Sequence, residues 1–259
     1  AMSWASGAGR AGDVNGDGFD DAIVTRWSYR TSSWPELFLG GDDGLAAQWS
    51  WQGAGYGTAV GDLNGDGLDD VFSQSQSPMA GVFYGRANGL PRLIEWGAPT
   101  SSYWGYPYAM AGVAAGDVNG DGYDDLLLSD PYFSNPETYE GRIILFYGAT
   151  GGLDRSPQWM WEGDLPNRGL GSTALGIGDV DGDGYDDILS GGGGLMVFPG
   201  SPTGPQPPAW QVPFTGAPRG AGDVDGDGYD DLLVGDPNYR SPNPAFPGKG
   251  RAMLFLGSA

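Results

Sequence analysis

A nine-residue acidic pattern, Asp-x-Asn/Asp-Gly-Asp-Gly-x-Asp-Asp, occurs five times in this chain and constrains its fold more than any other feature. Internal repeats are informative because each repeat is one supersecondary unit that buries its apolar face against its neighbours. The spacing between copies matches one such unit with connecting loops of variable length. The sequence therefore predicts five similar units. The copies begin at Asp13, Asp62, Asp117, Asp179 and Asp223.

Short apolar segments surround each acidic stretch, and the third repeat illustrates their order. A Gly/Ala-rich segment (112–116) leads in and an apolar run (125–129) follows. A second apolar run (142–148) ends in glycine, and a tryptophan segment (158–161) comes after a turn. Such runs between Gly, Pro, Asn and Asp turns indicate strands, and nothing in the chain sustains a helical period. Each repeat is therefore predicted to form four strands, with the acidic loop between the first and the second.

Repeated four-stranded units are typical of a β-propeller. We predict an all-β, five-bladed propeller with four-stranded antiparallel blades, forming a single domain over residues 1–259. The fifth repeat stops where its tryptophan strand should begin, while residues 2–5 contain a tryptophan with no strands before it. We therefore expect the N-terminal strand to complete the last blade and close the ring, which would remove both open edges. A solenoid and a fragment of a larger ring are the alternatives.

Composition and charge argue against several classes of function. The net charge of −21 makes nucleic acid or an anionic membrane an unsuitable partner, and no run is long and apolar enough for membrane insertion. The chain has no histidine and no cysteine, so the commonest general base and the thiol nucleophile are absent. Fivefold repetition of the acids indicates a structural device, because one active site would need only one copy. We predict a protein that is not an enzyme.

Oxygen donors alternate along each acidic loop in a way that suits Ca²⁺, which takes six to eight oxygen ligands in flexible geometry. Side chains at loop positions 1, 3, 5 and 9 and the carbonyl of position 7 would converge on one ion. Glycines at positions 4 and 6 permit the tight turns. We predict five Ca²⁺ ions, one per blade. The expected ligands are Asp13, Asn15, Asp17, Phe19 and Asp21; Asp62, Asn64, Asp66, Leu68 and Asp70; Asp117, Asn119, Asp121, Tyr123 and Asp125; Asp179, Asp181, Asp183, Tyr185 and Asp187; and Asp223, Asp225, Asp227, Tyr229 and Asp231.

Other metal loops fit less well. An EF-hand or dockerin loop needs a carboxylate at position 12, and none of the five copies has one there. Mg²⁺ prefers stricter octahedral geometry, and soft transition metals prefer His or Cys. Asp/Gly turns without any metal are the remaining alternative. The residues at position 12 are Val24, Ser73, Leu128, Ser190 and Val234.

The repeated loop resembles the FG-GAP repeats of integrin α-subunit propellers and their bacterial and fungal lectin-like relatives. Residues 126–131 (LLLSDP) and 232–237 (LLVGDP) are similar to the family's Gly-Ala-Pro segment, with Asp in place of Ala. Leu170-Gly171 and Tyr56-Gly57 approximate its Phe-Gly element. The resemblance implies a calcium-binding propeller that recognises a partner. The integrin ring has seven blades with calcium in only some, so ligand specificity is not carried over.

The loops at the opposite strand ends are irregular and rich in aromatic residues, which suit sugars or protein hot spots. We therefore predict an extracellular recognition or adhesion module, monomeric and secreted, cell-surface or periplasmic, that binds a protein or glycan through this face. The alternative is that these aromatic residues merely cap the core. The candidate ligand-binding residues are Tyr29, Trp34, Tyr103, Trp104, Tyr106, Tyr132 and Tyr239.

The tryptophans of the fourth strands recur once per blade, and we expect them to pack between blades. A lectin with sugar sites between the blades is one alternative function, and the lectin-like relatives favour it. A non-catalytic scaffold domain of a larger surface enzyme is the other.

Overall fold

A computed structural model of the chain describes residues 4–28, 32–50, 55–75, 80–98, 111–212, 216–240 and 250–259. These residues form nineteen β-strands and no helix, which confirms the predicted all-β class. None of the described segments is therefore a helix that could cross a lipid bilayer.

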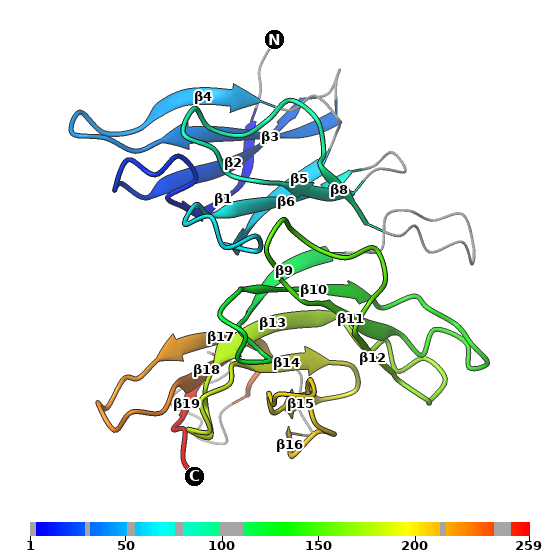
Figure 1. The fold of residues 1–259 in the computed structure, drawn as a ribbon. Coiled ribbons are helices and arrows are strands. Elements are labelled where there is room, and N and C mark those ends of the chain that lie inside the picture. Colours follow the sequence, from blue (N-terminus) through cyan, green and yellow to red (C-terminus); the bar gives the residue numbers. More distant parts are fainter. Residues whose placement is uncertain are drawn as a thin grey trace. The chain divides into compact units, whose positions relative to one another are not determined.

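The strands form five sheets in which neighbours in the sequence are neighbours in the sheet, antiparallel wherever the pairing is described (Figure 1). The first sheet contains β1 (Trp4–Gly12), β2 (Asp21–Ser28), β3 (Ser32–Leu39) and β4 (Ala46–Ser50). The second contains β5 (Gly55–Gly61), β6 (Asp70–Ser75), β7 (Gly81–Phe83) and β8 (Trp96–Gly97). The third contains β9 (Ala111–Gly116), β10 (Asp125–Asp130), β11 (Arg142–Phe146) and β12 (Trp159–Glu162). The fourth contains β13 (Thr173–Gly178), β14 (Asp187–Gly191), β15 (Leu195–Phe198) and β16 (Trp210–Val212), and the fifth β17 (Ala217–Gly222), β18 (Asp231–Asp236) and β19 (Arg251–Phe255).

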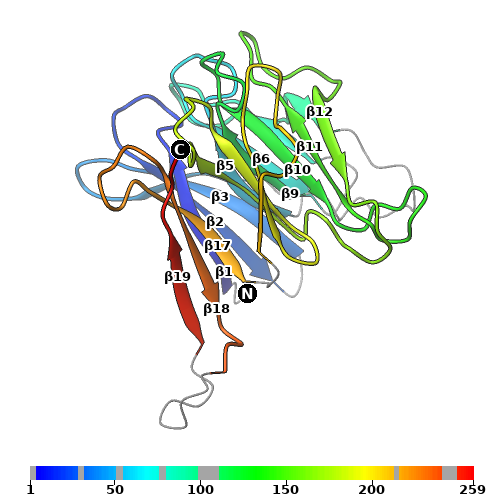
Figure 2. The ribbon, with the colours of Figure 1, turned by 90° about the horizontal axis from the view of Figure 1, so that it is seen from below.

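Five such sheets are the blade content of a five-bladed propeller. Four of them have four strands, and Figure 2 shows β17, β18 and β19 forming the fifth, which has three among the described residues. Trp4 begins β1 and lies opposite Trp27 of β2, so the N-terminal residues extend the first strand of the first sheet. Completion of the last sheet by the N-terminal segment, and with it ring closure, stays a prediction.

The first strand of each sheet ends in a glycine that the fold requires. A register shift in the pairing precedes Gly12, Gly61, Gly178 and Gly222, so the strand bulges at this point. Their φ angles are 71°, 76°, 76° and 66°, a left-handed region that residues with a Cβ rarely adopt. The bulge turns the chain out of the sheet and into the acidic loop.

The chain divides into two compact units. The first comprises Ala1–Ala114, Gly122–Leu128 and Ile144–Met160, and the second comprises Ala115–Asp121, Ser129–Ile143 and Trp161–Ala259. In the first unit, one apolar cluster joins the first two sheets through Ile23, Leu37, Val71 and Phe83. A second cluster joins the second sheet to strands of the third, and Phe72 and Phe146 are among its members.

The second unit has an apolar cluster of the same kind. Leu189 and Val197 of the fourth sheet pack with Leu232 and Val234 of the fifth. Because the apolar side chains of consecutive sheets face one another, each described core lies between two sheets. This arrangement is the one expected when each repeat buries its face against its neighbour.

The recurring tryptophans pack between consecutive sheets, as predicted. In four sheets the ring of a fourth-strand tryptophan meets, edge to face, a phenylalanine in the third strand of the next sheet. Ring centroids lie 4.9–5.6 Å apart, within the range where aromatic pairs attract. Two of the indole nitrogens also donate hydrogen bonds to backbone carbonyls, from Trp49 to Pro91 and from Trp96 to Asp154. The four pairs are Trp49–Phe83, Trp96–Phe146, Trp161–Phe198 and Trp210–Phe255.

Candidate metal centres

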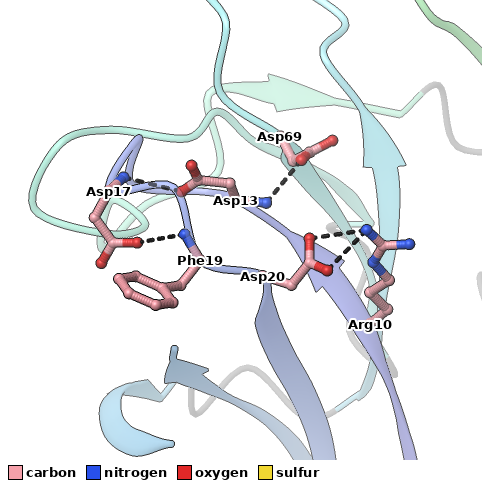
Figure 3. Close-up of polar contacts among 6 residues, drawn as sticks. All are labelled: Arg10, Asp13, Asp17, Phe19, Asp20 and Asp69. Atoms are coloured by element: carbon pink, nitrogen blue, oxygen red, sulfur yellow. Dashed lines mark hydrogen bonds and ion pairs between the residues drawn. The ribbon is translucent and has the colours of Figure 1, made fainter. Parts of the chain in front are cut away.

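The carboxylate at position 1 shapes each acidic loop. In the first loop Asp13 Oδ1 accepts hydrogen bonds from the amides of Gly16 (2.7 Å) and Asp17 (3.2 Å), and Oδ2 accepts from Gly18 (2.8 Å). Asp17 Oδ1 in turn accepts from the amide of Phe19 at 3.0 Å (Figure 3). Equivalent bonds to the position-1 carboxylate recur in the other four loops. Successive amides are thus gathered around one carboxylate, and the loop is held in a tight curve.

Position 3 divides the loops into two classes. The first three loops have asparagine there, and its amide nitrogen donates to the carboxylate at position 5. The donor–acceptor distances are 2.9 Å for Asn15–Asp17, 3.2 Å for Asn64–Asp66 and 2.9 Å for Asn119–Asp121. The last two loops have Asp181 and Asp225, which cannot donate when ionised.

The carboxylate at position 9 is buried in every loop. Asp21 is 2% exposed and its four equivalents are fully buried. In the second loop, Asp70 Oδ2 accepts from the amide of Leu63 at 2.9 Å and Oδ1 from Gly85 at 2.8 Å. The same pair of bonds occurs at Asp21, Asp187 and Asp231. Position 9 therefore ties the start of the loop to the glycine that follows the third strand of the same sheet.

Burial changes the electrostatics of this position. Desolvation raises the pKa of Asp70 to about 8 and that of Asp187 to about 7, although the backbone amides favour the charged form. Carboxylates at positions 1 and 5 or 3 of the same loop add to the shift. A divalent cation at this point would compensate the buried charge and keep the carboxylate ionised.

Loops four and five bring three acids together. One carboxylate oxygen from each of Asp179, Asp181 and Asp187 lies within 4.8 Å of the other two, and Asp223, Asp225 and Asp231 form the same cluster. Asp181 Oδ1 is buried and has no hydrogen-bond partner, as expected of an oxygen placed to bind a cation. An all-oxygen donor set of this kind fits Ca²⁺.

Not all of the predicted ligands belong to these two clusters. Asp183 and Asp227, at position 5, are exposed and lie outside the two clusters. Coordination by the position-7 carbonyls, and by the ligand sets of the first three loops, stays a prediction.

The carboxylate at position 8 links one loop to the loop before it. Asp69 Oδ2 accepts a hydrogen bond of 2.8 Å from the amide of Asp13, and the Asp69 amide donates to the carbonyl of Asp13 at 3.1 Å (Figure 3). We call this reciprocal pair the loop clasp. It recurs in the pairs Asp124–Asp62, Asp186–Asp117 and Asp230–Asp179.

The loop clasp gives a second reason for the glycine at the strand bulge. A Cβ built on Gly12 would collide with the carboxylate of Asp69, and Gly61, Gly116 and Gly178 meet the equivalent carboxylate in the same way. Asp20, at position 8 of the first loop, pairs with exposed Arg10 of its own sheet instead.

Side chains at position 7 also contact the preceding loop. A Cβ on Gly65 would meet the ring of Tyr123, and Gly120 and Gly182 stand in the same relation to Tyr185 and Tyr229. Close approach as well as turn geometry therefore requires glycine at position 4. The acidic loops are consequently joined to one another by side-chain packing and by hydrogen bonds.

Comparison with known proteins agrees with this geometry. A family model described as FG-GAP-like repeat matches residues 62–128, and one described as FG-GAP repeat matches residues 220–251. These two segments match FG-GAP repeats. The resemblance to integrin-like FG-GAP propellers is thereby confirmed.

Three curated proteins are similar to part of this chain. Integrin alpha-PS2 of Drosophila melanogaster is 32% identical over 124 residues, which is 42% of this chain and 8% of that protein. Integrin alpha-5 of Xenopus laevis is 32% identical over 121 residues, again 42% of this chain and 11% of the relative. Phosphatidylinositol-glycan-specific phospholipase D of Rattus norvegicus is 33% identical over 129 residues, 44% of this chain and 15% of the enzyme. The matched segments thus span 15% or less of these curated relatives.

Three of the seven predicted ligand-binding aromatic residues lie among the described residues. Tyr132, between β10 and β11, is 65% exposed and meets Tyr139 edge to face with centroids 6.2 Å apart. Trp34 lies in β3 opposite Arg26, and Tyr239 follows β18 with the Arg251 guanidinium 4.3 Å from its ring centroid. The other four candidates lie outside the described residues, namely Tyr29, Tyr103, Trp104 and Tyr106.

Sequence reasoning missed two features of the chain. The loop clasp gives position 8 a role outside the metal ligand set, and its signal was the strict repetition of Asp at this position. The other feature is a cluster of Glu140, Glu162 and Asp164 away from the acidic loops. These acids occur once and show no repeated spacing, so the sequence carried no signal for them.

Proposed function

We propose that this chain is a calcium-stabilised recognition module, forming one propeller domain over residues 1–259, that binds a protein partner through the strand ends opposite its acidic loops. Similarity to integrin α subunits supports recognition or adhesion as the general role. The observation that carries the proposal is the contrast between the two ends of the strands. At one end the acidic side chains are used within and between loops. At the other the connecting segments are unrepeated in sequence, and the one between β10 and β11 exposes the rings of Tyr132 and Tyr139.

Each acidic loop would hold one Ca²⁺ ion, five in all. The support is the donor set at positions 1, 3 and 9, together with the buried position-9 carboxylate, whose charge requires compensation. Millimolar calcium outside cells would keep even weak sites of this type occupied. We therefore propose a secreted or cell-surface location.

The binding face would include the segment between β10 and β11. The acidic loop of the third sheet leads into β10 at Asp125, so the segment after Asp130 lies at the other end of that strand. Tyr132 and Tyr139 form an exposed aromatic pair there. Aromatic rings with a polar edge are the residues most enriched in the energetic centres of protein interfaces.

A non-catalytic role accords with this picture, because the chain has no histidine or cysteine and its acids serve loop structure. The match to a phospholipase D is compatible with a scaffold role inside a larger enzyme. Sugar sites between sheets are less favoured, because the four fourth-strand tryptophans already pack against the next sheet.

Binding assays on the face test the proposal. The chain, in millimolar calcium, is screened against purified extracellular matrix proteins and against a glycan array. We expect a protein ligand whose binding falls at least about tenfold in the Tyr132→Ala/Tyr139→Ala double variant, the size typical of losing a hot spot. The exposed Leu93→Ala variant serves as the control and should bind normally. Glycan binding alone, or protein binding that the double variant retains, would contradict the proposal.

A further inference from the structure

Three carboxylates outside the acidic loops converge at the end of the third sheet. Glu140 directly precedes the Gly141–Leu170 bridge and β11, Glu162 ends β12, and Asp164 follows two residues later. One oxygen from each lies within 4.8 Å of the other two. This is the same closeness that the acids of loops four and five show. We call these residues the Glu140 cluster.

The innermost member has an oxygen without a partner. Glu140 is fully buried, and its Oε1 accepts a hydrogen bond from the amide of Asn135. Its Oε2 is also buried and accepts no hydrogen bond in the structure. A buried carboxylate oxygen left in this way is strongly unfavourable unless a cation or a proton compensates it.

The neighbouring arginine is shared with a fourth acid. Arg142 reaches towards Asp130, with its Nη2 3.4 Å from Oδ2, and its guanidinium carbon lies 3.8 Å from the ring centroid of Phe133. With Arg168, which donates to the carbonyl of Gly163, two positive charges lie beside four carboxylates. Like charges held this close repel one another until a proton or a cation joins them.

The three members of the cluster differ in exposure. Glu140 is buried, Glu162 is half-buried and Asp164 is exposed. Hydrogen bonds hold the backbone beside them, because the Gly163 amide donates to the carbonyl of Gly141 at 2.9 Å and Arg168 Nη1 donates to the carbonyl of Gly163 at 3.2 Å. The cluster therefore extends from a buried carboxylate to the surface.

We propose that Glu140, Glu162 and Asp164 bind a hard divalent cation, Ca²⁺, at the end of the third sheet opposite its acidic loop. Oxygen-only donors select Ca²⁺ or Mg²⁺ over softer metals, and irregular loops suit the flexible coordination of Ca²⁺. The ion would tie the segment that carries Tyr132 and Tyr139 to the turn after β12. The site stands on its own residues and does not depend on calcium in the five acidic loops.

Counting bound calcium in matched variants tests the site. Asp164→Asn keeps the shape of the side chain, and asparagine tolerates the φ of 53° at this position, so the fold should be preserved. Glu137→Gln, in the same segment but outside the cluster, is the control. By equilibrium dialysis with millimolar calcium, we expect Asp164→Asn and Glu162→Gln to bind one ion fewer than the native chain, and Glu137→Gln to bind the same number. Equal counts in all four proteins would overturn the inference.

A second readout separates an ion site from a structural role. Amide hydrogen exchange over residues 131–141 should slow when calcium is added to the native chain, and this calcium effect should be absent in Asp164→Asn. An equal calcium effect in both proteins would contradict the inference. The variant Asp17→Ala, in the first acidic loop, distinguishes the two calcium proposals. If Asp17→Ala loses an ion and Asp164→Asn does not, only the proposed calcium site at the Glu140 cluster is wrong. If Asp164→Asn loses an ion and Asp17→Ala does not, the site at the cluster is supported and the site in the first acidic loop is not.

Discussion

Loops with asparagine at position 3 and loops with aspartate there share one sequence pattern. They differ in whether the protein itself supplies a hydrogen-bond partner for the side chain at position 3. In the first three loops the asparagine amide donates to the carboxylate at position 5, so both side chains are partnered by the protein itself. In the fourth loop Asp181 has a buried oxygen with no partner, and burial, followed by the charge of Asp183, raises its pKa. Desolvation and Asp227 raise the pKa of Asp225 in the fifth loop in the same direction.

Loops that share one motif can therefore differ in how strongly their structure depends on a bound metal ion. An asparagine loop has a hydrogen-bonded arrangement available without an ion, although its amide oxygen must be the atom that turns to the ion when calcium binds. An aspartate loop carries one more negative charge and needs the ion to offset it. We therefore expect loops four and five to bind calcium more tightly and to be the first to loosen when it is removed.

The largest expected effect is common to both classes. Asp70→Ala and Asp187→Ala each remove the acceptor of two buried or part-buried amides, at position 2 and at the glycine after the third strand. We expect each variant to lower the free energy of unfolding by about 3 kcal/mol. Urea unfolding in the presence of calcium measures it. A loss confined to one class would show that position 9 has different roles in the two.

Exchanging asparagine and aspartate at position 3 tests the difference between the two loop classes most directly. Asp181→Asn should restore the amide donor found in the first three loops, so the metal-free protein should gain about 1 kcal/mol of stability. The same change removes a charged ligand, so calcium affinity should fall about tenfold. Chemical unfolding of the metal-free chain and calorimetric titration give the two values.

Asn64→Asp is the reciprocal variant and should show both signs reversed. If neither variant changes calcium affinity, position 3 does not bind the ion, and the division into two loop classes has no functional meaning.

The loop clasp should not distinguish the classes. Asp69→Asn removes the charge of the clasp between two asparagine loops, and Asp230→Asn removes it between two aspartate loops. Each should cost about 1 kcal/mol, since a charge-assisted hydrogen bond to a part-buried amide becomes a weaker neutral one. Asp20→Asn should change stability little, because exposed pairs such as Asp20–Arg10 contribute little. An equal loss in Asp20→Asn would show that Asp20 has a partner beyond Arg10.

A pH dependence should also appear, and its direction depends on calcium. In the metal-free protein the pKa values of Asp70, about 8, and Asp187, about 7, lie above the ordinary 3.8, so the folded state binds protons more tightly than the unfolded state. Stability from these groups is then full below pH 4 and is lost as the pH rises towards 8. With calcium bound, stability should instead rise with pH, because ligation requires ionised carboxylates. Melting temperatures from pH 5 to 8, with and without calcium, should show opposite slopes.

The features that could be predicted from the sequence are those that depend on local residue patterns. The strands, the acidic loops and the Trp49–Phe83 type of packing follow from alternation, turn residues and repetition, and all are confirmed. The loop clasp joins Asp69 to Asp13 across 56 residues, and its geometry depends on how two sheets meet. The Glu140 cluster depends on the pairing of β11 with β12 and on the course of a single irregular loop. Which distant residues meet in such contacts depends on tertiary packing, so a single sequence gives at most an indirect signal, such as the repeated Asp at position 8.

Thermal unfolding with and without calcium tests the central claim, that the acidic loops are calcium sites that stabilise the blades. At a calcium concentration 100 times its dissociation constant, one site adds about 2.7 kcal/mol. Each kcal/mol raises the melting temperature of a domain of this size by about 2–4 °C. Several occupied loops should therefore raise the transition by more than about 10 °C over chelator-treated protein, and further as calcium increases. Superimposable melting curves in calcium and in excess chelator would contradict the account.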